Sequence, residues 1–345
     1  MARGPADAIR DAIRERGPIA FDEYMTLALY GPGGFYRDPP VGPRGDFVTS
    51  PHVHPVFGAL IAEAVRRLAA ALDHPVTLRV AEIGAGDGTL ARQVLDGLRD
   101  LDLTYTAVEV SPGARERLAR IEDVRVVERL DEPAHVVLAN ELLDNLPFRR
   151  IRGNREVRVG LEEGRLTEVE VPWTGDPAPP GEERVVPDGV RRFVGSLAAV
   201  LAPGYALLID YGGAGSTGGD VHGYRAHHLV VDPLDEPGTA DITVGVDFAD
   251  VAHTAAEHGL AAFGPVSQRT ALVALGYQDR ARAELARQGR LLDDRKGIEA
   301  LRAWSGRSAA SLLVDPVALG RLRWIVLASE GLPGPEWLVT TEGEP

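Results

Sequence analysis

A glycine-rich turn between an apolar run and a helical pattern constrains the fold of this chain most. The stretch Arg79–Leu90 reads R-V-A-E-I-G-A-G-D-G-T-L. Its first half is a short apolar run, typical of a strand that is covered on both faces. Gly84, Gly86 and Gly88 allow positive φ angles and let a ligand approach the backbone. Apolar residues at helical spacing follow from Thr89. We therefore predict a strand, a ligand-binding turn and a helix.

The details of this turn favour S-adenosylmethionine over a dinucleotide as the ligand. A dinucleotide-binding turn has the pattern G-x-G-x-x-G, whereas the third glycine here comes one residue earlier. Glu82 precedes the first glycine, where a carboxylate would repel a pyrophosphate and attract the cationic ligand. Glu109 lies near the end of the next predicted strand, where it can accept hydrogen bonds from both ribose hydroxyls. We predict that Glu82 and Gly84 lie near the methionine end of the cofactor, and that further contacts come from Ala85, Gly86 and Val110.

Strand and helix patterns alternate along the rest of the chain, which predicts an α/β fold with a mostly parallel sheet and helices on both faces. A fourth predicted strand over 135–141 has Asn140 and Glu141 at its carboxyl end, and Asp144 follows. In open α/β sheets, ligands bind beyond the carboxyl ends of the strands. We therefore predict that Asn140 contacts the cofactor and that Glu141 and Asp144 are catalytic.

A fifth predicted strand over 205–211 ends in Asp210 and Tyr211, which are candidate substrate contacts. The segment that follows contains four more residues of functional types: Tyr224, Arg225, His227 and His228. We predict catalytic roles for Tyr224 and His227 and substrate contacts for Arg225 and His228. The two histidines are adjacent and have no regularly spaced third ligand, so no metal site is predicted.

The patterns divide the chain into an N-terminal helical segment (1–75), a first part of the cofactor-binding core (76–147), an inserted hairpin and helix (148–200) and the remaining core (201–345), with a substrate loop at about 212–250. Alternating apolar residues over 155–159 and 165–171 predict the hairpin. The polar segment 45–51 is predicted to close over the cofactor as a lid, with contacts from Asp46, Phe47, Thr49 and Ser50. Turn and capping chemistry is the alternative explanation for these residues.

Composition narrows the classes of function. The formal net charge of −14 argues against binding to nucleic acid. The chain contains no cysteine, which excludes disulfides and thiolate chemistry. We find neither a signal-peptide pattern nor an apolar run of membrane-spanning length. These features predict a cytoplasmic enzyme with no membrane partner.

Six motifs occur in order along the chain: F-D-x-Y-M at 21–25, G-D-F-x-T-S-P at 45–51, E-x-G-x-G at 82–86, N-E-L-L-D-x-L-P at 140–147, G-Y-R-x-H at 223–227 and D-I-T-x-x-V-D-F at 241–248. As a set they resemble the MidA family, the family of the mitochondrial complex I assembly methyltransferase. The resemblance runs from about Phe21 to the C-terminus and implies a class I, Rossmann-like methyltransferase fold. In mitochondrial members it implies symmetric dimethylation of an arginine on a complex I subunit. The loops 31–44 and 172–181 and the segment 319–324 depart from the family pattern.

Three functions remain open from the residues. If the acceptor is a protein arginine, Glu141 and Asp144 can hold the guanidinium group by bidentate pairing. If it is a hydroxyl or an acid on a small molecule, His227 can act as a general base, with Tyr224 and Arg225 as orienting groups. The third possibility is a non-catalytic assembly chaperone that binds S-adenosylmethionine. In the enzymatic cases S-adenosylhomocysteine is the product. The sequence leaves the oligomeric state open, a homodimer included.

Overall fold

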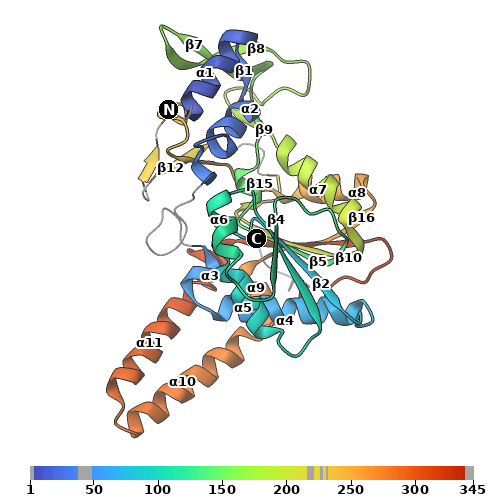
Figure 1. Cartoon of the computed structure of the whole chain (residues 1–345), viewed down its shortest axis with the longest axis vertical. Coiled ribbons are helices and arrows are strands. Elements are labelled where there is room, and N and C mark those ends of the chain that lie inside the picture. Colours follow the sequence, from blue (N-terminus) through green and yellow to red (C-terminus); the bar gives the residue numbers. More distant parts are fainter. Residues whose placement is uncertain (1–3, 38–48, 216–220, 226–227, 231, 339–345) are drawn as a thin grey trace.

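The computed structural model describes residues 4–37, 49–215, 221–225, 228–230 and 232–338. Its largest sheet has seven strands in the order β16-β17-β10-β5-β2-β3-β4 (Figure 1). Five neighbouring strands are parallel: β10 (Leu201–Asp210), β5 (Ala134–Asn140), β2 (Leu78–Ile83), β3 (Leu103–Val108) and β4 (Val124–Val127). The last strand, β17 (Arg323–Ser329), runs antiparallel to both of its neighbours, β10 and β16 (Leu260–Ser267). The predicted mostly parallel sheet is confirmed.

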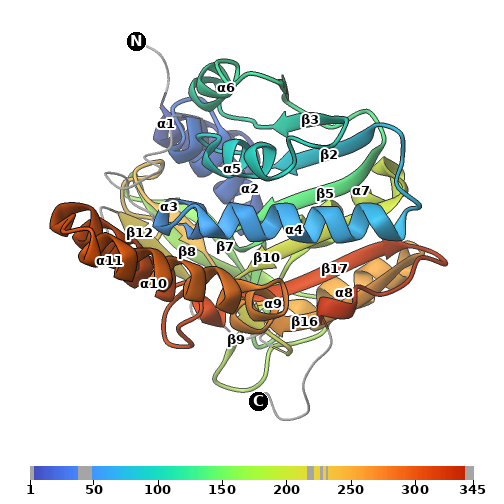
Figure 2. The same cartoon turned by 90° about the horizontal axis from the view of Figure 1, so that it is seen from below.

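Alternate residues of the central strands face two separate hydrophobic cores. On one face, Val80 belongs to a core that includes residues of α4 (Val56–Ala71), α5 (Thr89–Gly97) and α9 (Gln268–Ala274). On the other face, Ala81 belongs to a core with residues of α7 (Asp188–Val200) and α8 (Phe248–Glu257). Figure 2 shows α4 lying across the sheet. Because both faces are covered, the central strands are mainly apolar in their middle parts, and the polar residues of interest for function lie at or just beyond their carboxyl ends.

A second, antiparallel sheet joins the N-terminal segment to the insertion. Its strands are β1 (Ile19–Ala20), β7 (Arg155–Glu162), β6 (Arg149–Arg152), β9 (Glu183–Val186) and β8 (Arg165–Pro172). Strands β7 and β8 form the predicted hairpin, and β1 pairs with β7. The helices α1 (Pro5–Arg16) and α2 (Phe21–Met25) share a core with Phe148 and Val159. The N-terminal segment therefore folds together with the insertion, although the paired residues Ile19 and Val159 lie about 140 positions apart in the chain.

The remaining elements are short, apart from one long hairpin. They are the π-helical turn Thr26–Tyr30, the 3₁₀ turns Phe35–Arg37, Leu143–Asn145, Leu319–Arg321 and Glu336–Leu338, the helices α3 (Ser50–Val53) and α6 (Pro112–Leu118), and the strands β11 (Gly212–Gly213), β12 (His222–Arg225), β13 (His228–Val230), β14 (Asp241–Thr243) and β15 (Val246–Asp247). The helices α10 (Tyr277–Asp293) and α11 (Gly297–Ser311) form a hairpin that projects from the body (Figures 1 and 2). Within the described residues, we find no helix that combines the length and the apolar character needed to span a membrane.

Candidate active site

The glycine-rich turn leads from β2 into α5 as predicted. Gly84, Gly86 and Gly88 have φ angles of 75°, 56° and 77°, which residues other than glycine rarely adopt. A Cβ atom on Gly88 would lie 2.4 Å from the Cδ1 atom of Ile121, so that side chain would also have to shift to accommodate another residue there. A Cβ atom on Gly86 would meet nothing within 4 Å. The turn therefore has open space on the side of Gly86, where a ligand can approach the backbone.

Glu109 follows β3 and ties its end to the glycine-rich turn. Its Oε2 atom accepts a hydrogen bond of 2.9 Å from the backbone N–H of Gly86, and its Oε1 atom accepts one of 2.8 Å from that of Ser111. Burial raises the pKa of Glu109, although both N–H groups oppose the rise by favouring the carboxylate. The next residue, Val110, is 46% exposed. Glu109 thus lies directly beside the turn, as the sequence led us to expect.

Glu82 is more deeply buried than its position in the sequence suggests. It is buried within β2, and its Oε2 atom accepts a hydrogen bond of 2.6 Å from the hydroxyl of Tyr105. Burial raises the pKa of Glu82 to about 8, and the hydrogen bond from Tyr105 only partly offsets this effect. Burial therefore favours the neutral form of this side chain, whereas the sequence led us to expect a negative charge.

Glu141 occupies the carboxyl end of β5 in a strained backbone conformation. Its φ angle is 51°, which is uncommon for a residue other than glycine. The Oε1 atom accepts hydrogen bonds from the backbone N–H of Ser50 at 2.9 Å and from the Nδ2 atom of Asn140 at 3.1 Å. Burial raises its pKa, although these donors oppose the rise. Strain of this kind is concentrated at functional sites.

Asp210, at the end of β10, holds the turn that follows Glu141. Its Oδ2 atom accepts hydrogen bonds from the backbone N–H groups of Leu142, Leu143 and Asp144, at 3.0, 2.6 and 3.3 Å. Its Oδ1 atom accepts a bond of 2.7 Å from the N–H of Tyr211. Burial raises the pKa of Asp210 to about 7. Since its oxygens bind backbone donors and the residue is fully buried, its evident role is to position the turn. The predicted contact with substrate stays a prediction.

Two buried acceptor oxygens beside this turn have no hydrogen-bond donor among the described residues. They are Oδ1 of Asn140 and Oδ1 of Asp144. Burial raises the pKa of Asp144 well above its ordinary value, and the nearby Asp210, Asp241 and Glu141 raise it further. Buried polar atoms in native structures usually have partners. The site therefore offers unused acceptors, and its crowded carboxyl groups would be stabilised by a cation.

Asp241 is a buried carboxyl group that we did not single out from sequence. It lies on β14, and its Oδ1 atom accepts hydrogen bonds from the Nδ2 atom of Asn145 at 3.0 Å and from the hydroxyl of Tyr36 at 2.7 Å. The hydroxyl of Tyr30 donates to the backbone oxygen of Asn145 at 3.1 Å. These bonds connect the N-terminal segment to the turn after β5. The motif at 241–248, which begins with Asp241, was the sequence feature from which a role for this residue could have been predicted.

The short helix α3 and the preceding Thr49, at the end of the predicted lid, are joined to the glycine-rich turn. The Oγ1 atom of Thr49 lies 2.8 Å from Nδ1 of His52, and Nε2 of His52 lies 3.0 Å from Oδ2 of Asp87. Burial alone would raise the pKa of Asp87, but hydrogen bonds from His52 and Thr89 bring it to about 2. Ser50 is fully buried and contacts Glu141. A role for His52 and Asp87 was not predicted from the sequence, although each directly follows a motif described above.

The family of this chain follows from its similarity to known proteins. A family model described as "Putative S-adenosyl-L-methionine-dependent methyltransferase" matches residues 60–266, more than half of the chain. The chain belongs to this methyltransferase family. The resemblance inferred from the motifs is confirmed, and so are the fold class and the cofactor, S-adenosylmethionine.

Relatives and solved structures agree with the family. Protein arginine methyltransferase NDUFAF7 homolog, mitochondrial, from Drosophila melanogaster is 30% identical over 370 residues, covering 91% of this chain and 82% of the relative. The Homo sapiens protein of that name is 29% identical over 330 residues, covering 79% and 73%. A COG1565 superfamily member from Burkholderia thailandensis, solved with bound S-adenosylhomocysteine, has 28% identity and a TM-score of 0.81, with 96% and 92% coverage. This protein is an S-adenosylmethionine-dependent methyltransferase.

These comparisons correct one expectation. We predicted a cytoplasmic enzyme because we found no targeting pattern. The relatives from Drosophila melanogaster, Caenorhabditis elegans and Homo sapiens are all named as mitochondrial. The prediction of a cytoplasmic location is therefore wrong. The lack of a recognised targeting pattern does not determine where a folded enzyme works.

For several predicted site residues of the methyltransferase, the structure describes only the backbone or does not describe the residue. Asp46, Phe47 and His227 lie outside the described residues. Tyr224 and Arg225 on β12 and His228 on β13 are described only as backbone: Tyr224 is paired with Asp241 of β14, and Arg225 with His228. Strand β12 thus runs beside the buried Asp241. Tyr211 is partly buried under the guanidinium group of Arg321, 5.6 Å from its ring centroid.

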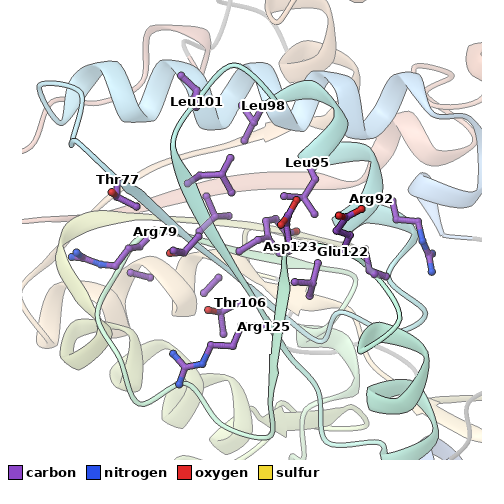
Figure 3. Close-up of a pocket in the computed structure, with 18 of the residues that line it drawn as sticks. Thr77, Arg79, Arg92, Leu95, Leu98, Leu101, Thr106, Glu122, Asp123 and Arg125 are labelled. Carbon is purple, nitrogen blue, oxygen red and sulfur yellow. The ribbon is translucent and has the colours of Figure 1, made fainter.

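The methyltransferase also has a large open cleft away from this site. Figure 3 shows it between α5, β3 and β4, with Arg79, Thr106 and Arg125 on one side and Leu95 and Leu98 on the other. Its volume is about 1120 Å³. The cleft includes residues at the starts of β2, β3 and β4, whereas the glycine turn and Glu141 lie at the carboxyl ends of their strands. It is therefore separate from the candidate active site.

Proposed function

We propose that this methyltransferase transfers methyl groups to the guanidinium group of an arginine in a protein substrate. The observation that carries this proposal is the group of carboxyls at the ends of β5 and β10, with Asp210 buried, Glu141 and Asp144 half-buried, and unused acceptors on Asn140 and Asp144. The names of the relatives, protein arginine methyltransferase, support the same acceptor. They also favour this function over a small-molecule methyltransferase and over a non-catalytic chaperone.

The hydrogen-bonding capacity of the site suits a guanidinium group. That group is planar, permanently charged and carries five N–H donors. In Glu141, the backbone N–H of Ser50 and the Nδ2 atom of Asn140 both donate to Oε1. Asp144 and Asn140 each have an Oδ1 atom without a donor among the described residues. An arginine head between Glu141 and Asp144 would supply donors to these atoms.

The charge of the site also favours a cation. In addition to burial, repulsion from Asp210, Asp241 and Glu141 raises the pKa of Asp144. Repulsion from Glu141 likewise raises the pKa of Asp210. A buried guanidinium group would favour the ionised form of the nearest carboxyls. A neutral hydroxyl acceptor would leave the repulsion among them in place.

The cofactor fits the glycine-rich turn in this proposal. Gly84 and Gly86 allow close approach, Glu109 accepts hydrogen bonds from the ribose, and Glu82 and Gly84 lie near the methionine end. Ala85, Val110, Asn140, Thr49 and Ser50 complete the proposed cofactor contacts. The open space beside Gly86 and the position of Glu109 next to it support this assignment. Because burial favours the neutral form of Glu82, we assign it a hydrogen-bonding role.

The residues of the chain then perform positioning and proton transfer. The bound cofactor supplies a methyl group on a sulfonium, which becomes a neutral thioether on transfer. Glu141 and Asp144 orient one guanidinium nitrogen toward that methyl group. When this nitrogen bonds to the methyl carbon, it must release one proton, and either carboxylate can accept it. Asp210 and Asn145 hold the turn that carries both groups.

The identity of the protein substrate rests on the family resemblance, which suggests a subunit of a complex I-type respiratory enzyme. The test is to incubate the protein with radiolabelled S-adenosylmethionine and a lysate from a strain that lacks it. We expect label in a protein band, and methylated arginine after acid hydrolysis. Glu141→Gln is the control that should remove the label. Label that appears only in the small-molecule fraction would contradict the proposal and favour the general-base alternative.

A further inference from the structure

The segment that follows α2 connects the acceptor side of the candidate active site to the cofactor side. This segment, residues 26–37, begins with a π-helical turn and ends with a 3₁₀ turn; we call it the strap. The hydroxyl of Tyr30 donates a hydrogen bond of 3.1 Å to the backbone oxygen of Asn145, in the turn after β5. The backbone oxygen of Arg37 accepts a bond of 2.7 Å from the hydroxyl of Ser111, which follows β3. The strap therefore spans the carboxyl ends of both strands.

Two tyrosines of the strap form a stacked pair among the carboxyls of the site. The rings of Tyr30 and Tyr36 have centroids 5.5 Å apart and planes at an angle of 22°. The hydroxyl of Tyr36 donates a bond of 2.7 Å to Oδ1 of Asp241, and that of Tyr30 binds the residue next to Asp144. Burial raises the pKa of both tyrosines, and the charges of Asp241 and Asp144 raise it further. Both hydroxyls therefore remain protonated and act as donors.

The exposure of the two rings distinguishes them from the core beside them. Neighbouring aromatic rings of the N-terminal core are covered: Phe21 and Tyr24 are 0% exposed, and Phe35 is 8% exposed. Tyr30 and Tyr36 are only half-buried, although both hydroxyls are held by hydrogen bonds. Rings that served only to fill the core would be covered like their neighbours. The uncovered surface of this pair is available to a bound group.

An aromatic surface supplies a selectivity that the carboxyls do not. Carboxylates such as Glu141 and Asp144 attract the ammonium group of a lysine as well as a guanidinium group. A guanidinium group is planar and stacks on aromatic rings, whereas an ammonium group is a compact, strongly hydrated point charge. A ring face beside the carboxyls therefore favours arginine over lysine.

We propose that Tyr30 determines the specificity of this enzyme for arginine, by providing the ring on which the acceptor guanidinium group stacks. Tyr36 is a positioning residue, since its ring packs between those of Tyr30 and Phe35 and its hydroxyl holds Asp241. Tyr30 is thus the end of the row of rings, and its hydroxyl binds the residue next to Asp144. This inference rests on the proposed function, because it takes the acceptor to be an arginine.

Competition between two small probes tests the specificity. N-acetylarginine amide or N-acetyllysine amide is added while the full-length protein methylates its substrate in the lysate from radiolabelled S-adenosylmethionine. For the wild type, half-inhibition should require at least about tenfold less of the arginine probe than of the lysine probe. Tyr30→Leu should reduce this ratio to about threefold or less, because it removes the ring. Tyr30→Phe keeps the ring and should keep the ratio.

Two further measurements separate specificity from folding. Tyr30→Leu should raise the KM for the lysate substrate about tenfold. Its affinity for S-adenosylmethionine, measured by calorimetry, should stay close to that of the wild type. Phe263→Leu is the matched control, because Phe263 is also a half-buried aromatic residue but lies on β16, at the edge of the main sheet. It should resemble the wild type in every measurement.

The possible failures can be told apart. If the wild type labels arginine and Tyr30→Leu leaves the ratio of the two probes unchanged, this inference alone is wrong. A ratio that falls equally in Tyr30→Phe would assign the effect to the hydroxyl and overturn the stacking role. A loss of S-adenosylmethionine affinity in Tyr30→Leu would show a general structural role and overturn it as well. A wild type that labels no protein arginine would contradict the proposed function, and this inference with it.

Discussion

The backbone N–H of Ser50 donates a hydrogen bond of 2.9 Å to the Oε1 atom of Glu141, joining residues 91 positions apart in the chain. Ser50 begins α3, at the end of the predicted lid, and Glu141 directly follows the central strand β5. The bond therefore links the segment that precedes α4 to the proposed catalytic carboxylate. Through His52 and Asp87 the same short helix also reaches the cofactor turn. Cofactor binding and the orientation of Glu141 are thus expected to depend on each other.

Glu141→Gln should keep the affinity for S-adenosylmethionine and lower turnover by about two orders of magnitude or more, a barrier increase of about 2.7 kcal/mol. The amide oxygen can still accept from Ser50, but the side chain cannot balance the charge of a guanidinium group. The measurements are calorimetric binding and single-turnover methylation of the labelled protein substrate.

A matched control for this change is Glu163→Gln. Glu163 also has a positive φ angle, 49°, but it lies in the turn between β7 and β8. It should have normal turnover. Near-normal turnover of Glu141→Gln, together with an inactive His227→Ala, would point instead to a general base acting on a neutral acceptor.

Glu109→Ala should weaken S-adenosylmethionine binding by about 2–3 kcal/mol, because it removes a charge-assisted pair of hydrogen bonds to the ribose. The substitution also frees the N–H groups of Gly86 and Ser111, which hold the turn. Glu109→Gln separates the two effects, since it keeps one acceptor for them. Isothermal calorimetry provides the affinities. An unchanged affinity in Glu109→Ala would rule out our placement of the ribose.

His52→Ala should weaken cofactor binding about 5–30-fold, since His52 holds α3 to Asp87 of the glycine-rich turn. Asp87→Asn should produce a similar loss, and the double variant should lose little more than either single variant. His253→Ala on α8 is the control, because its side chain is 74% exposed. Fully additive losses would show that the two residues act independently. Point substitution is preferable to deleting residues before Pro55, since that deletion would also remove the core shared by α1, α2 and Phe148.

Burial of Glu82 predicts a pH dependence of stability. Its pKa is raised to about 8 in the folded protein, from about 4.3 in an unfolded chain. Between these values the folded state binds more protons than the unfolded state, so the free energy of unfolding falls as pH rises. Glu82→Gln keeps an acceptor for the Tyr105 hydroxyl and removes this titration. We expect its Tm to fall less between pH 5 and pH 8 than that of the wild type, by at least about 2 °C.

The control for the pH experiment is Glu122→Gln, at an exposed position. Its Tm should follow the wild-type curve. Asp210, with a pKa of about 7, contributes in the same direction and remains in both variants. If Glu82→Gln reproduces the wild-type pH dependence, Glu82 does not titrate in this range.

The sequence by itself determined the strand, the glycine-rich turn and the helix over 79–97, because local propensity and tight packing act within a few residues there. It also predicted that Glu109 and Glu141 would lie at one edge of the sheet, since parallel strands present their carboxyl ends together. The hairpin of β7 and β8 followed from an alternating pattern and a turn at Gly164. These features can be predicted from local sequence patterns, without the contacts between segments far apart in the chain.

Only the tertiary structure decided which environment each carboxyl group has. Glu82 and Glu109 look alike in the sequence, each near the end of a strand, yet one accepts from a buried tyrosine and the other from the backbone of the turn. The pairing of Ser50 with Glu141, and of His52 with Asp87, depends on how α3 packs over the sheet. Contacts between segments far apart in sequence set burial and hydrogen bonding. Burial and hydrogen bonding in turn set the charge of a side chain, which no local pattern records.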